Sequence, residues 1–477
     1  MNGETGRERV LRETVEAPAP AAAGISQVHV GVVAIPIATI LASNLLPART
    51  SVEGALFWPA WIMTAGLLSG AVSDMFHGGI STLLRVQHIV MFGLVMIGYA
   101  ELLQPSYSTP LEPDTIRQTF IAIGLFGTAL SIGCSLSPPN LPRTLDNFAR
   151  RNYSRETVFR ILLACWIVAM FYYVYSSDFS LTRIVTGLLA ERFGTPWTRG
   201  QLGDWTAFLD FLSNFGFIVP PFTVALALLF KSWWRPPVIA GIICSTVYFA
   251  FILQAGGRRQ VVAIIGASAM TWFCARIKSL RVKHYAAGAL LILCTAVLIE
   301  LVLAGRSIGF AQYEYKGTNL GEIHIDNNFQ ALGETLKAIP ANHDFVGFGH
   351  VWYVLVRPIP RVFWPEKPVN SGFDLAAYLG YRDVSLSMTA VGEAYMSFGW
   401  LGIAVGGFAF GVLARFWVQL IDRGYGVMGS VLYSLGAMTL MIGTRSFLEL
   451  VVMAYPIVCW YFLDRVFVGW PPSAGLQ

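Results

Sequence analysis

The stretch PVIAGIICSTVYFAFILQ, which covers Pro237–Gln254, contains no charged residue. It is close to the roughly 20 residues that an α-helix needs to cross the hydrocarbon of a bilayer. Its apolar residues run on without a regular alternation with polar ones, and a helix satisfies every backbone polar group within the segment itself. The stretch therefore predicts a membrane-spanning helix, and much of the chain repeats this pattern.

About twelve runs of this kind predict an all-α polytopic membrane protein. The composition agrees, because 55% of the 477 residues are hydrophobic and only 13% are charged, about half the usual charged share. The predicted spans cover residues 30–46, 54–73, 86–104, 118–137, 158–176, 207–230, 237–254, 260–275, 284–304, 389–413, 426–443 and 447–463.

These spans divide the chain into four parts. Residues 1–24 are predicted to form a disordered cytoplasmic tail, and residues 25–304 a transmembrane bundle of about nine helices. Residues 305–388 form one large loop with short helices. Residues 389–477 hold the last three spans and the cytoplasmic C-terminus.

The large loop is predicted to be structured, because it is rich in aromatic residues and glycine, and loops of this length are often functional. Residues 326–338 have helical spacing of apolar residues. The run GFGHVWYVLV (Gly347–Val356) is too short to span a membrane and ends close to Pro358. This run therefore predicts a re-entrant or interfacial helix.

Basic residues set the predicted orientation. Lys and Arg are more frequent in the N-terminal tail and in every second turn, as in the cluster from Arg276 to Lys283. Because basic turns stay on the cytoplasmic side, both termini are predicted inside and the large loop is predicted to be periplasmic. The net charge of +5 is small and gives no sign of nucleic-acid binding, and the inner basic clusters suit contact with membrane lipid.

Several arginines lie on the side that this orientation should leave poor in basic residues. Since guanidinium groups bind phosphate through two parallel hydrogen bonds, they predict a site for a lipid pyrophosphate. Simpler interpretations stay open: Arg258 and Arg259 only snorkel to headgroups, Arg445 only pairs with Glu449, or the loop arginines only complement a helix dipole. The candidate binding residues are Arg258, Arg259, Arg306, Arg357, Arg361, Arg382 and Arg445.

Three residues are candidates for a catalytic base, with Glu393 as the first choice and His324 and His350 as the alternatives. Glu393 stands where the large loop enters the tenth predicted span, and His324 and His350 lie in the loop. Imidazole titrates near neutral pH, so a histidine needs no tuning for this role. In the alternative interpretation Glu393 pairs with an outer arginine and orders the site, and each histidine is structural. The sequence contains no P-loop, GxGxxG, HExxH or CxxC pattern, so neither a cofactor nor a metal is predicted.

Three short motifs carry a resemblance to a known family. They are AGGRRQ (Ala255–Gln260), RPIPRVFWPEKP (Arg357–Pro368) and GEAYMSFGWLG (Gly392–Gly402). Together with the large loop before the last three spans, they resemble the Wzy-type O-antigen and exopolysaccharide repeat-unit polymerases of bacteria. The resemblance implies a metal-independent glycosyltransferase of the inner (plasma) membrane with a GT-C-like helical fold.

The same resemblance implies the substrates. The enzyme would transfer a growing glycan from undecaprenyl pyrophosphate to the non-reducing end of the next lipid-linked repeat unit at the periplasmic face. It implies roles for Arg258 or Arg259, for Arg357 and Arg361, and for Glu393, and it allows a chain-length regulator as a further partner. Two other functions stay open, an O-antigen ligase and a non-enzymatic flippase or polysaccharide exporter. The loop motif favours the polymerase, and the low charge of the spans disfavours a transporter.

Overall fold

The computed structural model describes residues 29–138, 140–191, 194–197, 205–308, 327–381 and 386–468, except the side chains of residues 29, 299–308 and 466–468. The predicted tail, residues 1–24, lies outside these ranges. Within them every regular element is a helix and no β-strand occurs. The all-α class is therefore confirmed for the described part of the chain.

The elements are long helices joined by shorter ones. The long helices are α1 (His29–Asn44), α2 (Phe57–Gly78), α3 (Val86–Gly98), α4 (Pro113–Ser135), α6 (Arg155–Ser176), α9 (Val219–Phe230), α10 (Pro236–Gln254), α11 (Arg258–Ala275), α12 (Val282–Ile308), α16 (Thr389–Asp422), α17 (Val427–Gly443) and α18 (Phe447–Val468). The short ones are η2 (Ile80–Leu84), α5 (Arg143–Ala149), α7 (Leu181–Leu189), α8 (Trp205–Ser213), η3 (Asn214–Ile218), η4 (Ile277–Ser279), α13 (Asn328–Ala338), α14 (Phe348–Val356) and α15 (Leu375–Tyr378).

Several of these helices are suited to a bilayer. Among the described residues, 6 helices are long and apolar enough to cross a membrane, and shorter apolar helices accompany them. The 6 candidate spans are Pro113–Ser135, Arg155–Ser176, Trp205–Phe230, Pro236–Gln254, Thr389–Asp422 and Phe447–Arg465. This set of apolar helices indicates a membrane protein.

Helix ends differ from the predicted spans where buried contacts extend a helix or proline divides one. α2 continues past the predicted end at residue 73, because Asp74 is buried and hydrogen-bonded to His88 instead of facing water. The predicted span 207–230 consists of α8, η3 and α9, and two prolines lie in the first turn of α9. The predicted loop boundary at residue 305 falls inside α12.

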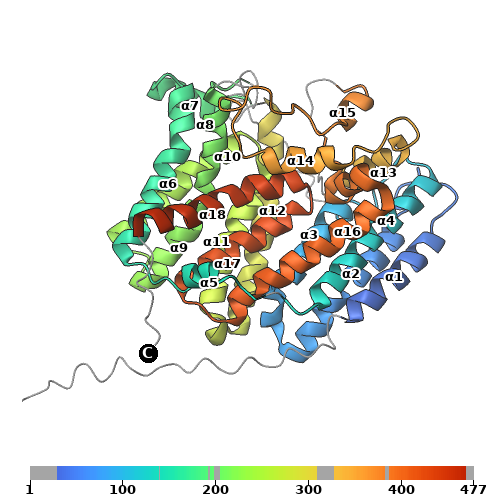
Figure 1. Cartoon of the computed structure of the whole chain (residues 1–477), viewed down its shortest axis with the longest axis horizontal. Helices are drawn as coiled ribbons and strands as arrows, with labels where there is room; N and C mark the ends of the chain where they lie inside the picture. Colours follow the sequence, from blue (N-terminus) through green and yellow to red (C-terminus); the bar gives the residue numbers. More distant parts are fainter. Residues whose placement is uncertain are drawn as a thin grey trace, which may run out of the picture.

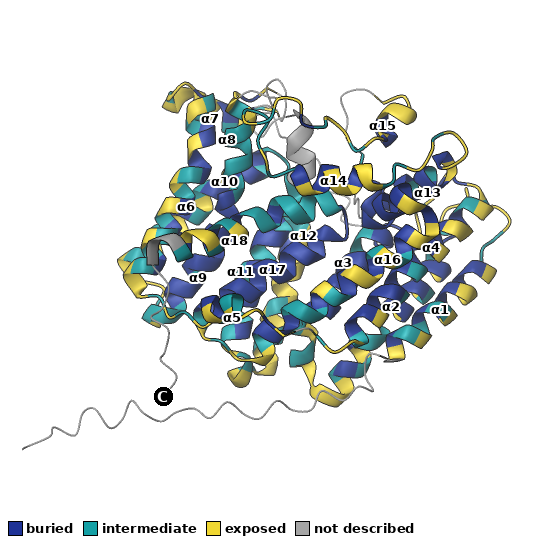
Figure 2. Ribbon diagram, in the orientation of Figure 1, coloured by how far each residue is buried: buried dark blue, intermediate teal, exposed yellow. Residues whose placement is uncertain are grey.

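The core is built around α17 and α16. Every residue of α17 from Met428 to Gly443 is buried, and the buried colour runs through this central part of the bundle in Figure 2. α16 packs closely along α4: an added Cβ at Gly407 would lie 2.4 Å from the carbonyl oxygen of Phe126, and one at Gly411 would lie 2.1 Å from that of Leu130. Because glycine has no side chain, the two backbones approach each other and hold α16 in place.

A kink in α16 positions the residues discussed below. Phe398 and Gly399 have non-helical backbone angles, and Gly399 adopts a φ of 63°, which glycine tolerates readily. The kink separates a short first segment, which carries Glu393, from the long remainder of the helix. Figure 1 shows α13, α14 and α15 gathered at the end of the bundle from which α16 starts. Both α13 and α14 occur where the sequence predicts helices.

Candidate functional site

Glu393 is held at the first turn of α18. This residue, on the first segment of α16, is only 7% exposed. Ser446 donates a hydrogen bond from Oγ to Glu393 Oε1 at 2.5 Å, and the backbone N–H of Phe447 donates to Oε2 at 2.8 Å. A helix N-terminus offers unpaired N–H groups and a positive dipole end, so it is a favourable place for a carboxylate.

His350 completes this arrangement from α14. Its Nε2 lies 3.3 Å from Glu393 Oε2, and the residue is 4% exposed. A carboxylate oxygen only accepts hydrogen bonds, so in the neutral imidazole Nε2 carries the hydrogen and Nδ1 keeps a lone pair. Within the described ranges His350 Nδ1 has no hydrogen-bond partner. The pair thus consists of an oriented imidazole with an unused acceptor nitrogen and a carboxylate that fixes it.

Backbone contacts fix α14 against the kinked helix. The N–H of Val346 donates to the carbonyl of Met396 at 3.0 Å, and the N–H of Gly347 donates to that of Ser397 at 2.9 Å. Gly347 has a φ of 62°, which directs the chain into α14. These bonds tie the start of α14 to the kink of α16, so that His350 and Glu393 face each other.

Two of the predicted arginines meet at Glu449, in the first turn of α18. Arg445 Nη1 donates to Glu449 Oε1 at 2.7 Å, as the i,i+4 spacing suggests. Arg259, in the first turn of α11, forms an ion pair with the same carboxylate. Arg445 is buried, whereas 43% of the Arg259 side chain is exposed.

The first turns of two helices and their arginines therefore come together at this end of the bundle. α11 starts at Arg258, directly after the glycine pair of the AGGRRQ motif, and its first turn reaches the first turn of α18 through Arg259 and Glu449. Helix N-termini and guanidinium groups both favour anions. We call the set His350, Glu393, Ser446, Arg259, Arg445 and Glu449 the α18 site.

The loop motif RPIPRVFWPEKP uses its basic residues differently. Arg361 Nη2 donates to the carbonyl of Pro368 at 2.6 Å, and Arg357 Nη1 donates to the hydroxyl of Tyr353 at 3.2 Å. Lys367 is 5% exposed and donates from Nζ to the carbonyls of Arg357 and Ile359 at 2.9 and 2.7 Å. These hydrogen bonds join residues within the loop and the end of α14 to one another.

Lys367 has a perturbed ionisation. Burial, and next the charges of Arg357 and Arg361, lower the pKa of its ammonium group to about 8. The ammonium group caps two carbonyls at the C-terminal end of α14, where a positive charge complements the helix dipole. Lys367 therefore holds the loop in shape, a role that the sequence did not reveal.

The remaining predicted residues fall outside what the structure describes. His324 and Arg382 lie in ranges 309–326 and 382–385, and only the backbone of Arg306 is described. Ser446 is a residue of the α18 site that sequence reasoning missed. Its signal was present, because Ser446 and Glu449 have the S-x-x-E spacing of a helix capping box.

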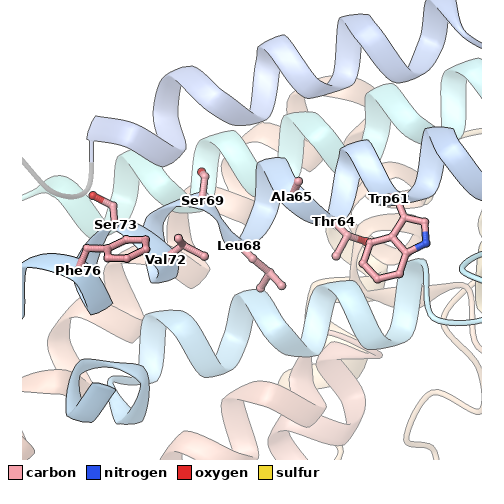
Figure 3. A pocket seen from close by; sticks show the side chains of 8 residues that line it. All are labelled: Trp61, Thr64, Ala65, Leu68, Ser69, Val72, Ser73 and Phe76. Carbon is pink, nitrogen blue, oxygen red and sulfur yellow. The ribbon is translucent and has the colours of Figure 1, made fainter. Parts of the chain in front are cut away.

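A groove elsewhere on the molecule shares no residue with the α18 site. It has a volume of about 540 Å³ and runs along α2 (Figure 3). No charged side chain lines it, so it lacks the groups that bind phosphate. Its lining residues are Trp61, Thr64, Ala65, Leu68, Ser69, Val72, Ser73 and Phe76.

Comparison with known proteins adds one finding. A family model described as a domain of unknown function, DUF8712, matches residues 319–468. The matched segment includes α13 to α18, and with them His350, Glu393, Arg445 and Glu449. No curated protein and no solved structure matches the chain.

Proposed function

We propose that this chain is a metal-independent glycosyltransferase that polymerises lipid-linked oligosaccharide repeat units in a bacterial inner membrane. The observation that carries the proposal is the His350–Glu393 pair at the first turn of α18, next to the Arg259–Glu449–Arg445 cluster. A base and an anion-binding group lying this close together suit transfer of a sugar from a pyrophosphate carrier. The resemblance of the three sequence motifs supports the same class.

The proposal includes a membrane topology. The chain would cross the membrane about twelve times in a GT-C-like arrangement, with both termini in the cytoplasm and the α18 site at the periplasmic face. The donor would be a growing glycan on undecaprenyl pyrophosphate, and the acceptor the next lipid-linked unit. The distribution of basic residues in the sequence supports this orientation.

In the proposed reaction the acceptor hydroxyl attacks the anomeric carbon of the donor glycan. A new glycosidic bond forms, the bond from that carbon to the pyrophosphate oxygen breaks, and its electron pair leaves with undecaprenyl pyrophosphate. The hydroxyl proton passes to His350 Nδ1, the unused acceptor of the pair. Glu393 already accepts hydrogen bonds from Ser446 and Phe447, so it orients the imidazole and stabilises its positive charge.

Phosphate binding would use the arginines at Glu449. In the structure the carboxylate of Glu449 forms ion pairs with both Arg259 and Arg445. A pyrophosphate would compete with this carboxylate for the N–H groups of the two arginines. Positive charge placed where the leaving group gains negative charge is often the largest single term in such catalysis. Because His350 is buried, the proposal also requires α14 to move for the acceptor to reach Nδ1.

The experiment that tests the proposed function uses the purified full chain in lipid nanodiscs with undecaprenyl-pyrophosphate-linked repeat units. Polymerisation gives a ladder of longer lipid-linked glycans without added nucleotide or metal. Glycan transferred only to a lipid A core would show a ligase instead. Movement of intact lipid-linked units across the bilayer, without a new glycosidic bond, would show a transporter.

A further inference from the structure

A second buried polar cluster lies at the opposite end of the bundle. The segment of α16 after the kink, residues 400–422, is roughly 33 Å long, and the first segment packs against its beginning, because an added Cβ at Gly402 would lie 2.1 Å from the carbonyl oxygen of Ala394. Glu393 is on the first segment, whereas Asp422 at the end of α16 forms an ion pair at 3.4 Å with Arg85, the residue before α3. The polar residues where α2 ends and α3 begins are therefore far from the α18 site.

Three side chains form this cluster. His88 Nε2 lies 2.9 Å from Asp74 Oδ2, and Gln87 neighbours His88 in the first turn of α3. All three residues are more than nine-tenths buried. In the described part of the chain, Asp74 Oδ1 and Gln87 Oε1 have no hydrogen-bond partner. Buried oxygens of this kind need a donor or a cation.

Both residues with unpartnered oxygens line the same small cavity. It has a volume of about 30 Å³, and Ser131 and Cys134 of α4 form part of its wall. Gly31 helps keep it open, because an added Cβ there would lie 3.0 Å from Ser131 Oγ. The space is enough for one small ion or one or two water molecules.

The charge of the cluster favours a cation. His88 Nε2 faces only one oxygen of Asp74, Oδ2, and Asp74 Oδ1 lies unpartnered beside Gln87 Oε1 at the same cavity. Two oxygen acceptors without a donor favour a cation between them. The nearby cation Arg415 interacts with Cys134 of the cavity wall and forms no ion pair with Asp74. Among the described residues, the one ion-pair partner of Asp74 is His88.

We propose that Asp74, Gln87 and Ser131 bind a sodium ion in this cavity. The donors would be a carboxylate, an amide carbonyl and a hydroxyl, and such oxygen ligands suit a hard cation. The single carboxylate matches a monovalent ion. The described residues hold no group of three His, Cys, Asp or Glu that would suit a transition metal. The site is independent of the proposed catalytic function.

The test measures the thermal unfolding midpoint of the purified full chain in detergent. Sodium chloride is varied against choline chloride at constant ionic strength and pH, with potassium chloride as a second series. Because the ion binds the folded chain, the midpoint should rise by a few degrees as sodium increases. Asp74→Asn and Gln87→Leu should remove the rise, whereas Asp422→Asn, which deletes a carboxylate at the same end of the bundle, should keep it.

Binding of radiolabelled sodium by the same preparations provides a readout that does not depend on folding. One ion per chain is expected for the wild type and for Asp422→Asn, and none for Asp74→Asn. A midpoint that is equal in sodium and choline would overturn the proposal. So would a rise retained by Asp74→Asn, or a wild-type midpoint that responds to pH alone, since a proton or water would then satisfy the two oxygens.

Discussion

Replacement of Glu393 tests whether its carboxylate organises the α18 site. Glu393→Ala leaves the N–H of Phe447 and the Nε2–H of His350 without their acceptor; His350 is buried and Phe447 is partly buried. An unsatisfied buried donor costs about 1–3 kcal/mol, so the two together predict a loss of about 2–6 kcal/mol in the free energy of unfolding. Ser446 adds less, because its hydroxyl can rotate to another acceptor.

Glu393→Gln should cost much less. The amide oxygen can take the place of Oε2 and accept from Phe447 and His350, while the amide NH₂ donates to Ser446 Oγ. The variant loses only the negative charge that strengthens three hydrogen bonds. This predicts a loss of about 1–3 kcal/mol in the free energy of unfolding. The Ala variant should therefore be clearly less stable than the Gln variant.

The assay is reversible unfolding of the purified protein in mixed detergent micelles, followed by tryptophan fluorescence. Glu366→Ala is the control, because Glu366 is an exposed residue in the neighbouring loop motif and its loss should change stability by less than about 0.5 kcal/mol. If Glu393→Ala were as stable as Glu393→Gln, or as the control, Glu393 would not be the buried acceptor described above.

Three further predictions concern Lys367, Arg259 and the membrane topology. The pKa of Lys367 is about 8 in the folded chain and 10.5 ordinarily, so between these pH values the unfolded chain binds more protons than the folded chain. The free energy of unfolding should therefore rise from pH 8 to 10.5. Lys367→Met should flatten that rise, and an unchanged dependence on pH would contradict the assignment. Arg259→Lys should lower polymerisation roughly tenfold, because lysine lacks the planar fork, whereas Arg183→Lys on α7 should not; equal activities would mean that Arg259 binds no phosphate. A cysteine at exposed Asn370 should react with a membrane-impermeant reagent in intact cells and one at Lys278 only after lysis, and the reverse pattern would invert the topology.

Much of the fold could be predicted from the sequence. Long uncharged runs have few solutions in a bilayer besides helices, and the short run Gly347–Val356 was predicted to be a separate helix, which is α14. Hydropathy was less informative at helix ends. It placed the end of the second span before Asp74, because a charged residue ordinarily marks the water boundary, and it could not show that His88 pairs with Asp74 from another helix.

The site could be predicted only as a set of candidates. The sequence predicts Glu393 and His350 as separate candidates. Only the fold shows their 3.3 Å contact, since the kink at Gly399 and the backbone bonds to α14 create it. The pairing of Arg445 with Glu449 follows from helical spacing and was foreseeable. The ion pair of Arg259 with the same Glu449 could not be predicted from the sequence, because it depends on how α11 and α18 pack.

The central claim is that His350 is the base of a glycosyl transfer at the α18 site, and single-turnover kinetics test it most directly. The purified chain would be mixed with one lipid-linked donor and one lipid-linked acceptor, and formation of the longer glycan followed for the wild type, His350→Ala and His343→Ala. His343 is a half-buried histidine of the same loop that makes no contact with Glu393 in the described part of the chain, and it serves as the matched control. A positioned base contributes about 10²–10⁴-fold, so His350→Ala should slow the transfer by at least about a hundredfold, while His343→Ala stays near the wild-type rate. A His350→Ala protein that forms the glycosidic bond at the wild-type rate would contradict the account.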